Sequence, residues 1–264
     1  MDLNLANKVV VVTGASRGVG LATVQSFVQE GAIVVAGART VSTALQELAA
    51  HAQVLSVSVD LATSDGPQRL VDAAVQRFGG VDALVNNVGA VSPRLQGIAS
   101  ITDEQWLETM NLNLMSAVRA SRAALPSLLE RQGTIVNISS VNAFLPDPGV
   151  ADYTVSKAAL TNYSKALSKE VGPQGVRVNT VSPGPITTDI WTAESGLVGT
   201  IAAAMGVDME TATDQFVAEL GGFATGRFTR PEEVADLIVM IASSRAGNVT
   251  GADFVIDGGL IKTL

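Results

Sequence analysis

Seven short runs rich in valine and isoleucine recur along this chain, and they limit its possible folds more than any other feature. Most of them are continuously apolar instead of alternating, which indicates strands covered on both faces, as in parallel sheets flanked by helices. The runs are KVVVVTG at 8–14, AIVVAGA at 32–38, VLSVSVD at 54–60, ALVNNVG at 83–89, GTIVNISS at 133–140, VRVNTVSPG at 176–184 and DFVIDGG at 253–259. We therefore predict seven strands.

The stretches between these runs carry helix signals. Thr102 is followed three residues later by Gln105, a capping-box pattern, and Pro231 precedes two acids at the start of another helical segment. This alternation predicts an α/β fold: a doubly wound seven-stranded parallel sheet with helices on both faces, the Rossmann fold. The 264 residues contain no internal repeat, low-complexity tract or proline-rich linker, so we expect one domain, 1–264.

The first predicted strand leads directly into the glycine-rich sequence TGASRGVG, which contains Gly14, Gly18 and Gly20. One glycine permits a tight turn, the next lets the backbone approach a pyrophosphate, and the last allows close packing of the following helix. The amide N–H groups at that helix N-terminus would then face phosphate. A glycine triplet alone can be an ordinary turn, but its place between a strand and a helix predicts dinucleotide binding.

The end of the second strand indicates which dinucleotide is bound. A carboxylate there would bond a ribose 2′-hydroxyl, whereas an arginine would accept a 2′-phosphate. This chain has Arg39 there, and Arg17 inside the glycine loop supplies a second positive charge. Together they favour NADP(H) over NAD(H), although either alone could be an ordinary surface residue. Asp60, at the end of the third strand, is expected to meet the adenine or to cap a helix.

The composition excludes several other classes of protein. A formal net charge of −8 leaves no basic surface of the kind that binds nucleic acid or anionic membranes. The absence of cysteine excludes disulfides, thiolate nucleophiles and thiolate metal ligands. His51, the only histidine, lies away from every motif, so we expect no metal site. With no signal peptide and no apolar run long enough to span a bilayer, we expect a cytoplasmic protein whose partners are small molecules.

The sequence YTVSK at 153–157 places Tyr153 four residues before Lys157, so both side chains share one face of a helix. A free tyrosine keeps its proton until about pH 10. A neighbouring buried ammonium favours the phenolate, and we therefore expect a lowered pKa for Tyr153. Such a pair is suited to acid–base chemistry near neutral pH, and a solvated helix face is the alternative interpretation.

Six motifs follow one another in a fixed order along nearly the whole chain. They are TGASRGVG at 13–20, NNVG at 86–89, NISS at 137–140, YTVSK at 153–157, SPGPITTD at 182–189 and TGADFVIDGG at 250–259. On this ordered set the chain resembles the short-chain dehydrogenase/reductases of the standard-length branch, and among them the 3-oxoacyl reductases. Val88 stands where most of these proteins have alanine, and its effect near the cofactor is left open.

The resemblance implies roles for four catalytic residues. Tyr153 would exchange a proton with the substrate oxygen while hydride passes to or from nicotinamide C4, and Lys157 would bond the nicotinamide ribose. Ser140 would polarise the carbonyl group. Asn113 would hold a water against Lys157, with Asn111 as the lesser candidate. Taken singly, each of these residues could instead be a cap, a kink or a surface group.

The resemblance also implies which residues contact the cofactor. Asn87 would lie along the adenosine ribose, and Ile186 and Thr188 would bond the nicotinamide carboxamide after a turn at Pro183 and Gly184. The full set of expected cofactor contacts is Gly14, Ser16, Arg17, Gly18, Val19, Gly20, Arg39, Asp60, Leu61, Asn87, Gly89, Tyr153, Lys157, Pro183, Gly184, Ile186 and Thr188.

The stretch least like the family, about 189–223, is expected to be a substrate lid. Its apolar residues would favour an apolar substrate, although periodicity alone cannot separate a lid from packing on the protein's own core. They are Trp191, Leu197, Val198, Ile201, Met205, Met209, Phe216 and Leu220. Phe144, Leu145 and Pro146 are further candidate pocket walls.

These observations predict an NADP(H)-dependent oxidoreductase that interconverts a ketone or aldehyde and an alcohol, working as a reductase of an apolar carbonyl compound. A 3-oxoacyl-thioester reductase is the alternative within the family, and a sugar-alcohol or steroid-like dehydrogenase stays open. A non-catalytic dinucleotide-binding regulator would not need Tyr153 and Lys157. The resemblance further implies a homotetramer, in whose interface the apolar C-terminal sequence DFVIDGGLIKTL could be buried.

Overall fold

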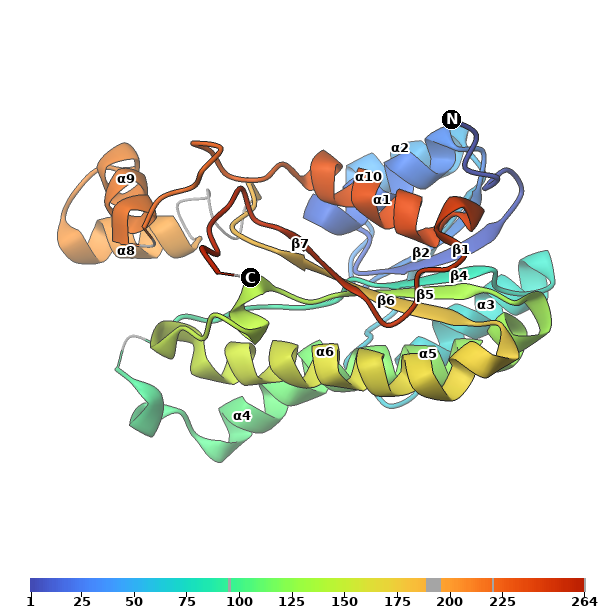
Figure 1. Cartoon of the computed structure of the whole chain (residues 1–264), viewed down its shortest axis with the longest axis horizontal. Coiled ribbons are helices and arrows are strands. Elements are labelled where there is room, and N and C mark those ends of the chain that lie inside the picture. Colours follow the sequence, from blue (N-terminus) through green and yellow to red (C-terminus); the bar gives the residue numbers. More distant parts are fainter. Residues whose placement is uncertain (95, 189–195, 220, 264) are drawn as a thin grey trace.

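The apolar runs form the strands of one sheet. The computed structural model describes residues 1–94, 96–188, 196–219 and 221–263, and in these ranges seven parallel strands follow the order β3-β2-β1-β4-β5-β6-β7 (Figure 1). The strands are β1 (Val9–Thr13), β2 (Ile33–Ala38), β3 (Val54–Ser58), β4 (Ala83–Asn86), β5 (Thr134–Ile138), β6 (Arg177–Pro183) and β7 (Asp253–Ile256). Each predicted run contains one strand, so the predicted fold class is confirmed.

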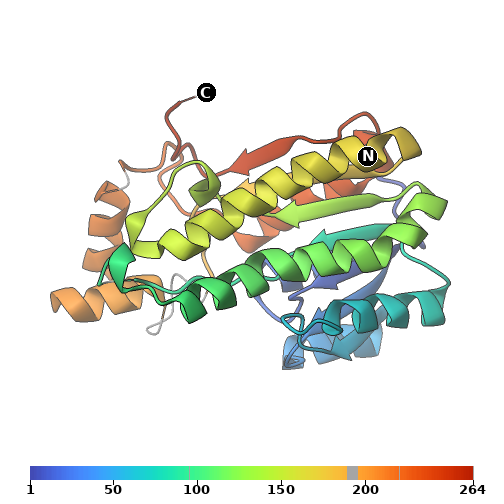
Figure 2. The same cartoon turned by 90° about the horizontal axis from the view of Figure 1, so that it is seen from below.

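The side chains of β1 alternate between two hydrophobic cores, one on each face of the sheet. Val10 and Val12 belong to one core, and Val9 and Val11 belong to the other. The first face carries α1 (Gly18–Gln29), α2 (Thr43–His51) and α10 (Pro231–Ala242), and the second carries α3 (Gly66–Phe78), α5 (Ser116–Arg131) and α6 (Ala151–Val171) (Figures 1 and 2). Helices on both faces explain why the strands read as continuous apolar runs.

The strand order reverses beside β1, because the chain places β2 and β3 on one side of it and β4 to β7 on the other. In doubly wound sheets such a reversal leaves a crevice outside the carboxyl ends of the strands. The loops that follow β1 and β4 meet at this point. The topology therefore predicts that a ligand binds between these two loops.

The helix α4 (Asp103–Met110) begins at the predicted capping box. The Thr102 hydroxyl accepts a hydrogen bond from the N–H of Gln105 (3.3 Å), and the Gln105 side chain accepts one from the N–H of Thr102 (3.1 Å). The chain then passes through a π-helical turn, Asn111–Met115, into α5. Such turns are often found at functional sites, and this one carries Asn113.

The helices α8 (Leu197–Met205) and α9 (Met209–Glu219) lie beyond one end of the sheet (Figure 1). Val198, Ala202 and Ala212 are buried between them, and Ile201 and Met209 pack against these three residues. Val198, Ile201 and Met209 of the expected lid thus belong to a small separate core, whereas Met205 is 51% exposed. Trp191 and Leu220 lie outside the described residues, as do the side chains of Leu197 and Phe216.

The described part of the chain has no helix long and apolar enough to cross a bilayer. In the same residues there is no group of three or more His, Cys, Asp or Glu side chains that could hold a metal ion. His51 is exposed at the end of α2, away from the crevice, so it takes no part in the site described below.

Candidate active site

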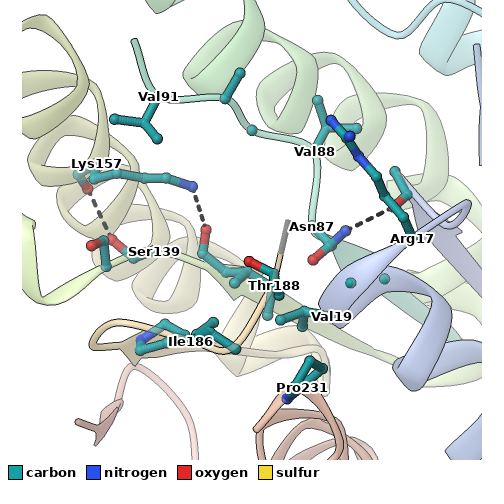
Figure 3. Close-up of a pocket in the computed structure, with 18 of the residues that line it drawn as sticks. Arg17, Val19, Asn87, Val88, Val91, Ser139, Lys157, Ile186, Thr188 and Pro231 are labelled. Atoms are coloured by element: carbon teal, nitrogen blue, oxygen red, sulfur yellow. Dashed lines mark hydrogen bonds between the residues drawn. The ribbon is translucent and has the colours of Figure 1, made fainter. Parts of the chain in front are cut away.

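A cavity of about 1090 Å³ opens at the carboxyl ends of the strands. Arg17 and Val19 lie on one side of it and Lys157 and Ser139 on the other, with Thr188 between them (Figure 3). Every residue expected to contact the cofactor lines this cavity. Residues spread over 175 positions of sequence, from 14 to 188, therefore form one continuous wall.

The glycine loop at one end of the cavity depends on the absence of side chains. Gly14 has a φ of +68° and Gly18 a φ of +53°, a backbone conformation that favours glycine. A Cβ atom on Gly20 would lie 2.1 Å from the carbonyl oxygen of Gly14, so only glycine lets α1 approach β1 this closely. Gly18 and Val19 bring the N-terminus of α1 to the cavity, where its positive dipole end favours an anion.

Asn87 stabilises this loop from the end of β4. Its side-chain amide donates hydrogen bonds to the carbonyl oxygens of Thr13 and Gly14, both at 3.0 Å. The preceding Asn86 donates to Asn137 Oδ1 on β5 at 2.8 Å, which joins neighbouring strands. Asn87 thus has a structural function that the motif alone did not indicate, in addition to lining the cavity.

The two arginines at the cofactor end are exposed, and both line the cavity. Within residues 1–94, 96–188, 196–219 and 221–263, neither Arg17 nor Arg39 forms an ion pair with an acidic side chain. Asp60 also lines the cavity, and its Oδ1 accepts a hydrogen bond from the N–H of Ala62 (2.9 Å), which stabilises a turn ahead of α3. Both guanidinium groups are therefore open to an anionic ligand.

Lys157 lies at the opposite end of the cavity, with 3% of its surface exposed. Its ammonium donates a hydrogen bond to the carbonyl oxygen of Ile138 (2.8 Å) and lies 5.7 Å from the centre of the Tyr153 ring. Burial lowers the pKa of Lys157 to about 8, because desolvation disfavours the charged form. A Cβ atom on Gly89 would lie 3.1 Å from Nζ, a tight contact, so glycine leaves more room for the ammonium here.

The pKa of Tyr153 differs in direction from the expectation. Burial raises the pKa of this phenol, and a hydrogen bond with Ser140 acts in the opposite direction without overcoming it. The expected lowering by Lys157 was therefore wrong for the protein without cofactor. Desolvation disfavours the phenolate, and in the same way it makes the ammonium of Lys157 lose its proton more readily.

Ser140 follows β5 and faces the same cavity as Tyr153. Its hydroxyl donates to Asn142 Oδ1 (3.3 Å) and accepts from the N–H of Asn142 (3.2 Å). Asn142 also lines the cavity, and its contact with Ser140 was not indicated by any motif. Ser139 instead donates to the carbonyl oxygen of Lys157 (3.2 Å), which ties the end of β5 to α6.

Asn113 lies behind the cavity wall. Its Oδ1 accepts from the N–H of Ala90 (2.9 Å), and its Nδ2 donates to the carbonyl oxygen of Ala90 (2.9 Å) and to Ser156 Oγ (3.0 Å). Asn111 points elsewhere and donates to the carbonyl oxygen of Ala62 (2.8 Å). Asn113 is thus the asparagine beside α6, and it holds the loop after β4 against that helix.

Comparison with known proteins agrees with this geometry. Residues 8–196 match the family model described as short chain dehydrogenase. The chain belongs to the short-chain dehydrogenase family. It is therefore an oxidoreductase, and its seven-stranded sheet is the fold of these enzymes.

Several relatives of this short-chain dehydrogenase match it along its whole length. An uncharacterized oxidoreductase of Bacillus subtilis, YvrD, is 35% identical over 100% of both chains. A 3-oxoacyl-(acyl-carrier-protein) reductase of Thermotoga maritima is 34% identical over 98% of this chain and 100% of its own. The crystal structure of L-sorbose reductase from Gluconobacter frateurii, complexed with NADPH and L-sorbose, has 36% identity and a TM-score of 0.91, and covers 100% of both chains.

The segment after β6 forms the remaining wall of the site in this short-chain dehydrogenase. Gly184 donates its N–H to the carbonyl oxygen of Ile256 (2.9 Å), and a Cβ atom there would lie 2.9 Å from Asp257. Ile186 pairs with Thr229, which brings the chain from β6 beside the segment that leads into α10. Both Ile186 and Thr188 line the cavity.

The cavity wall beside Tyr153 carries polar as well as apolar side chains. Leu145 and Pro146 line the cavity as expected, whereas Phe144 is 46% exposed and is not part of the wall. Asn142 and Asp147 line the same region, and both are half-buried. The described residues of α8 and α9 do not reach the cavity wall.

A buried ion pair in the first turn of α6 was not predicted from the sequence. Arg94, in the loop after β4, pairs with Asp152, the residue before Tyr153. The two residues are 58 positions apart and belong to no motif quoted above, so only the folded chain shows that they meet.

Proposed function

We propose that this protein is an NADP(H)-dependent carbonyl reductase that converts a ketone or aldehyde into an alcohol. The observation that carries the proposal is the position of Tyr153, Lys157 and Ser140 at one end of a cavity whose other end holds the glycine loop and two arginines that form no ion pair with any described residue. A dinucleotide needs both ends, because its phosphates and its nicotinamide lie far apart. A regulator that only binds the dinucleotide would not need the catalytic side chains of Tyr153 and Ser140.

The cavity fits the dinucleotide on steric and electrostatic grounds. A Cβ atom on Gly20 would clash with the carbonyl oxygen of Gly14 at 2.1 Å, and Cβ atoms on Gly14 and Gly89 would make tight contacts of 3.0 and 3.1 Å with Asn87 and Lys157, so all three positions favour glycine. The N-terminus of α1 and the guanidinium of Arg17 provide positive charge for phosphates. Arg39 would accept a 2′-phosphate, which supports a preference for NADP(H).

The catalytic residues would act on the substrate oxygen. When bound, the nicotinamide supplies the hydride. Ser140 would polarise the carbonyl group by a hydrogen bond, and Tyr153 would donate the proton that completes the alcohol. Lys157 would bond the ribose and hold positive charge beside the phenol, while Asn113 would keep the loop carrying Gly89 and Ala90 in place.

The raised pKa of Tyr153 favours the reduction direction of the reaction. A phenol whose pKa is raised by burial keeps its proton at neutral pH and is ready to donate it. Oxidation of an alcohol would require the phenolate, which burial disfavours. A bound oxidised nicotinamide, being cationic, would lower that pKa and make the reverse reaction accessible.

The substrate is proposed to be an apolar carbonyl compound or a polyhydroxy ketone. The first is supported by Leu145, Pro146 and Val91 on the cavity wall. The second is favoured by the half-buried polar groups of Asn142 and Asp147, and by the likeness to L-sorbose reductase. A 3-oxoacyl thioester is the third candidate, on the likeness to the Thermotoga maritima protein.

One panel of assays tests both parts of the proposal. NADPH and NADH consumption is measured with ketoses, with apolar ketones of similar size, and with an acyl thioester. Tyr153→Phe should lower kcat by about 100-fold or more while leaving the Kd for NADPH within about 2-fold. Full turnover by the phenylalanine variant would exclude the proton-donor role, and turnover of one substrate class identifies the substrate.

We also propose that the enzyme is a homotetramer. Leu107 on α4 is 69% exposed, Val155 on α6 is 47% exposed, and Met240 and Val255 are 52% and 47% exposed. Association of subunits through these elements would remove the exposed apolar side chains from water. Light scattering coupled to size-exclusion chromatography measures the mass directly.

A further inference from the structure

Asn142 contacts the Ser140 hydroxyl directly, although it belongs to none of the six motifs. Ser140 Oγ donates a hydrogen bond to Asn142 Oδ1 (3.3 Å) and accepts one from the N–H of Asn142 (3.2 Å). Ser140 also bonds the Tyr153 side chain, a contact that lowers the pKa of the phenol against the larger effect of burial. The Asn142 side chain is therefore connected through one hydroxyl group to the proposed proton donor.

The Asn142 side chain is held in one orientation by a short turn. It lies in a 3₁₀ turn, Val141–Ala143, which is closed by a hydrogen bond from the N–H of Leu145 to the carbonyl oxygen of Val141 (2.8 Å). Asn142 Nδ2 donates to the carbonyl oxygen of Leu145 (3.2 Å), and an amide turned the other way would set its oxygen against that carbonyl. The amide oxygen therefore faces Ser140, from a half-buried residue that lines the cavity.

The Ser140 hydroxyl uses all its hydrogen-bonding capacity on the protein itself. A serine hydroxyl has one proton to donate and two lone pairs that accept. The proton goes to Asn142 Oδ1, and the lone pairs can accept from the N–H of Asn142 and from the hydroxyl of Tyr153. To polarise a substrate carbonyl, Ser140 must therefore turn its proton away from Asn142 Oδ1.

The effect of this turn on Asn142 depends on the substrate. The distance of 3.3 Å is longer than the about 2.7–2.8 Å of a typical O–H···O hydrogen bond, so Ser140 can release Asn142 readily. A substrate that covers Asn142 Oδ1 with an apolar group leaves this acceptor without a donor, which is unfavourable. A substrate with a hydroxyl group beside its carbonyl group replaces the lost donor, because Ser140 Oγ and Asn142 Oδ1 are close enough for one small fragment to contact both.

We propose that Asn142 is a specificity-determining residue and that the substrates are α-hydroxy ketones, in which the carbon next to the carbonyl group carries a hydroxyl group. The substrate hydroxyl donates to Asn142 Oδ1 and replaces the proton of Ser140, which then turns to the carbonyl oxygen. This inference rests on the proposed function and chooses among the substrate classes named there. A ketose in its open-chain form belongs to this class, whereas a simple apolar ketone and a 3-oxoacyl thioester do not.

Three small ketones separate hydrogen bonding from the other effects of a hydroxyl group. Hydroxyacetone has the hydroxyl, butanone has a methyl group in its place, and methoxyacetone has an electron-withdrawing oxygen there that cannot donate. We expect kcat/KM, measured by NADPH consumption, to be about 10- to 100-fold higher for hydroxyacetone than for butanone, because butanone leaves Asn142 Oδ1 without a donor. Methoxyacetone should resemble butanone within about 3-fold, since it supplies no donor either.

Variants at position 142 test the residue itself. Asn142→Leu has a similar size and no acceptor, so its kcat/KM should be about 10-fold lower for hydroxyacetone and about 3-fold higher for butanone, because Ser140 keeps its proton free. Asn142→Asp keeps an oxygen acceptor at the same place and is the matched control. It should retain a preference for hydroxyacetone over butanone of at least about 5-fold.

A purely structural role of Asn142 in its turn predicts a different result. Loss of that turn would lower kcat/KM for both ketones equally and leave their ratio unchanged. Circular dichroism and the Kd for NADPH, which should stay within about 2-fold, check that each variant is folded. If Asn142→Leu does not fold, the comparison of the three ketones on the unsubstituted enzyme carries the test.

The possible outcomes separate this inference from the proposed function. Equal kcat/KM for hydroxyacetone and butanone, or for hydroxyacetone and methoxyacetone, would overturn the inference and leave the reductase standing. A ratio that Asn142→Leu leaves unchanged would overturn the assignment to Asn142. Absence of turnover with these three ketones also overturns the inference, and the proposed function falls with it only if the wider panel of carbonyl compounds gives none.

Full turnover by Tyr153→Phe would exclude the proton-donor role of the tyrosine. The ratio of kcat/KM for hydroxyacetone to that for butanone would keep its meaning in that case, because it reports on Asn142 and Ser140.

Discussion

The two ends of this enzyme use glycine for different physical reasons. At the cofactor end, a Cβ atom on Gly20 would meet a backbone oxygen at 2.1 Å, and one on Gly14 would meet the Asn87 side chain at 3.0 Å. In the segment that follows β6, a Cβ atom on Gly206 or Gly222 would meet nothing within 4 Å, although both residues have positive φ. Packing restricts the positions of Gly14 and Gly20 to glycine, whereas only backbone conformation favours glycine at 206 and 222.

This difference indicates where the molecule tolerates change. The cofactor end is part of the main core, so a displaced helix α1 disturbs the sheet beneath it. The helices α8 and α9 have a separate small core, and their described residues do not line the cavity. Substitutions should therefore affect cofactor binding strongly at the first end and weakly at the second.

Gly20→Val should have the largest effect. Its side chain must displace α1 from β1, an overpacking that costs about 1–3 kcal/mol and raises the Kd for NADPH by up to about 100-fold. Fluorescence titration with NADPH measures the loss. Gly206→Val, in open space, is the matched control, and an equal loss of affinity there would contradict the contrast between the two ends.

Arg39→Asp should have the next largest effect, on the choice of cofactor. A carboxylate at the end of β2 repels a 2′-phosphate and can bond a ribose 2′-hydroxyl, so the ratio of kcat/KM for NADPH to that for NADH should fall about 30-fold. Arg39→Lys keeps the charge and should change the ratio only a few-fold. A ratio that Arg39→Asp leaves unchanged would show that this arginine does not contact the cofactor.

The pH dependence of NADPH use should follow Lys157. Its pKa of about 8 means that the ammonium is present below this value and is lost as pH rises through it. We therefore expect kcat/KM for NADPH to fall about tenfold per pH unit above pH 8, because this parameter reports on the free enzyme. A flat profile up to pH 10 would indicate that the neutral amine serves equally well.

Gly222→Ala should have the smallest effect. Its φ of +74° costs an alanine about 1 kcal/mol, which lowers Tm by about 2–4 °C in a protein of this size. The Kd for NADPH should stay within about 2-fold, as measured by the same titration. A loss as large as that of Gly20→Val would mean that the two ends are coupled through the cavity.

The local sequence was sufficient for the fold and for most of the site wall. Valine-rich runs predicted all seven strands, and Thr102 with Gln105 predicted the start of α4, because both signals depend on residues close in sequence. The glycine spacing predicted the turn after β1 for the same reason. Each of these features follows from backbone sterics and short-range hydrogen bonds, which a sequence carries directly.

The remaining features depend on contacts between distant segments. The partnership of Arg94 and Asp152 and the separate core of α8 and α9 arise only when the chain is folded. The direction of the Tyr153 pKa shift also depends on the folded chain, because desolvation depends on everything that surrounds the phenol. The four-residue spacing of Tyr153 and Lys157 specifies only one of these neighbours. Spacing along a helix reveals which side chains share a face, and burial by the rest of the molecule decides how unfavourable their charged forms are.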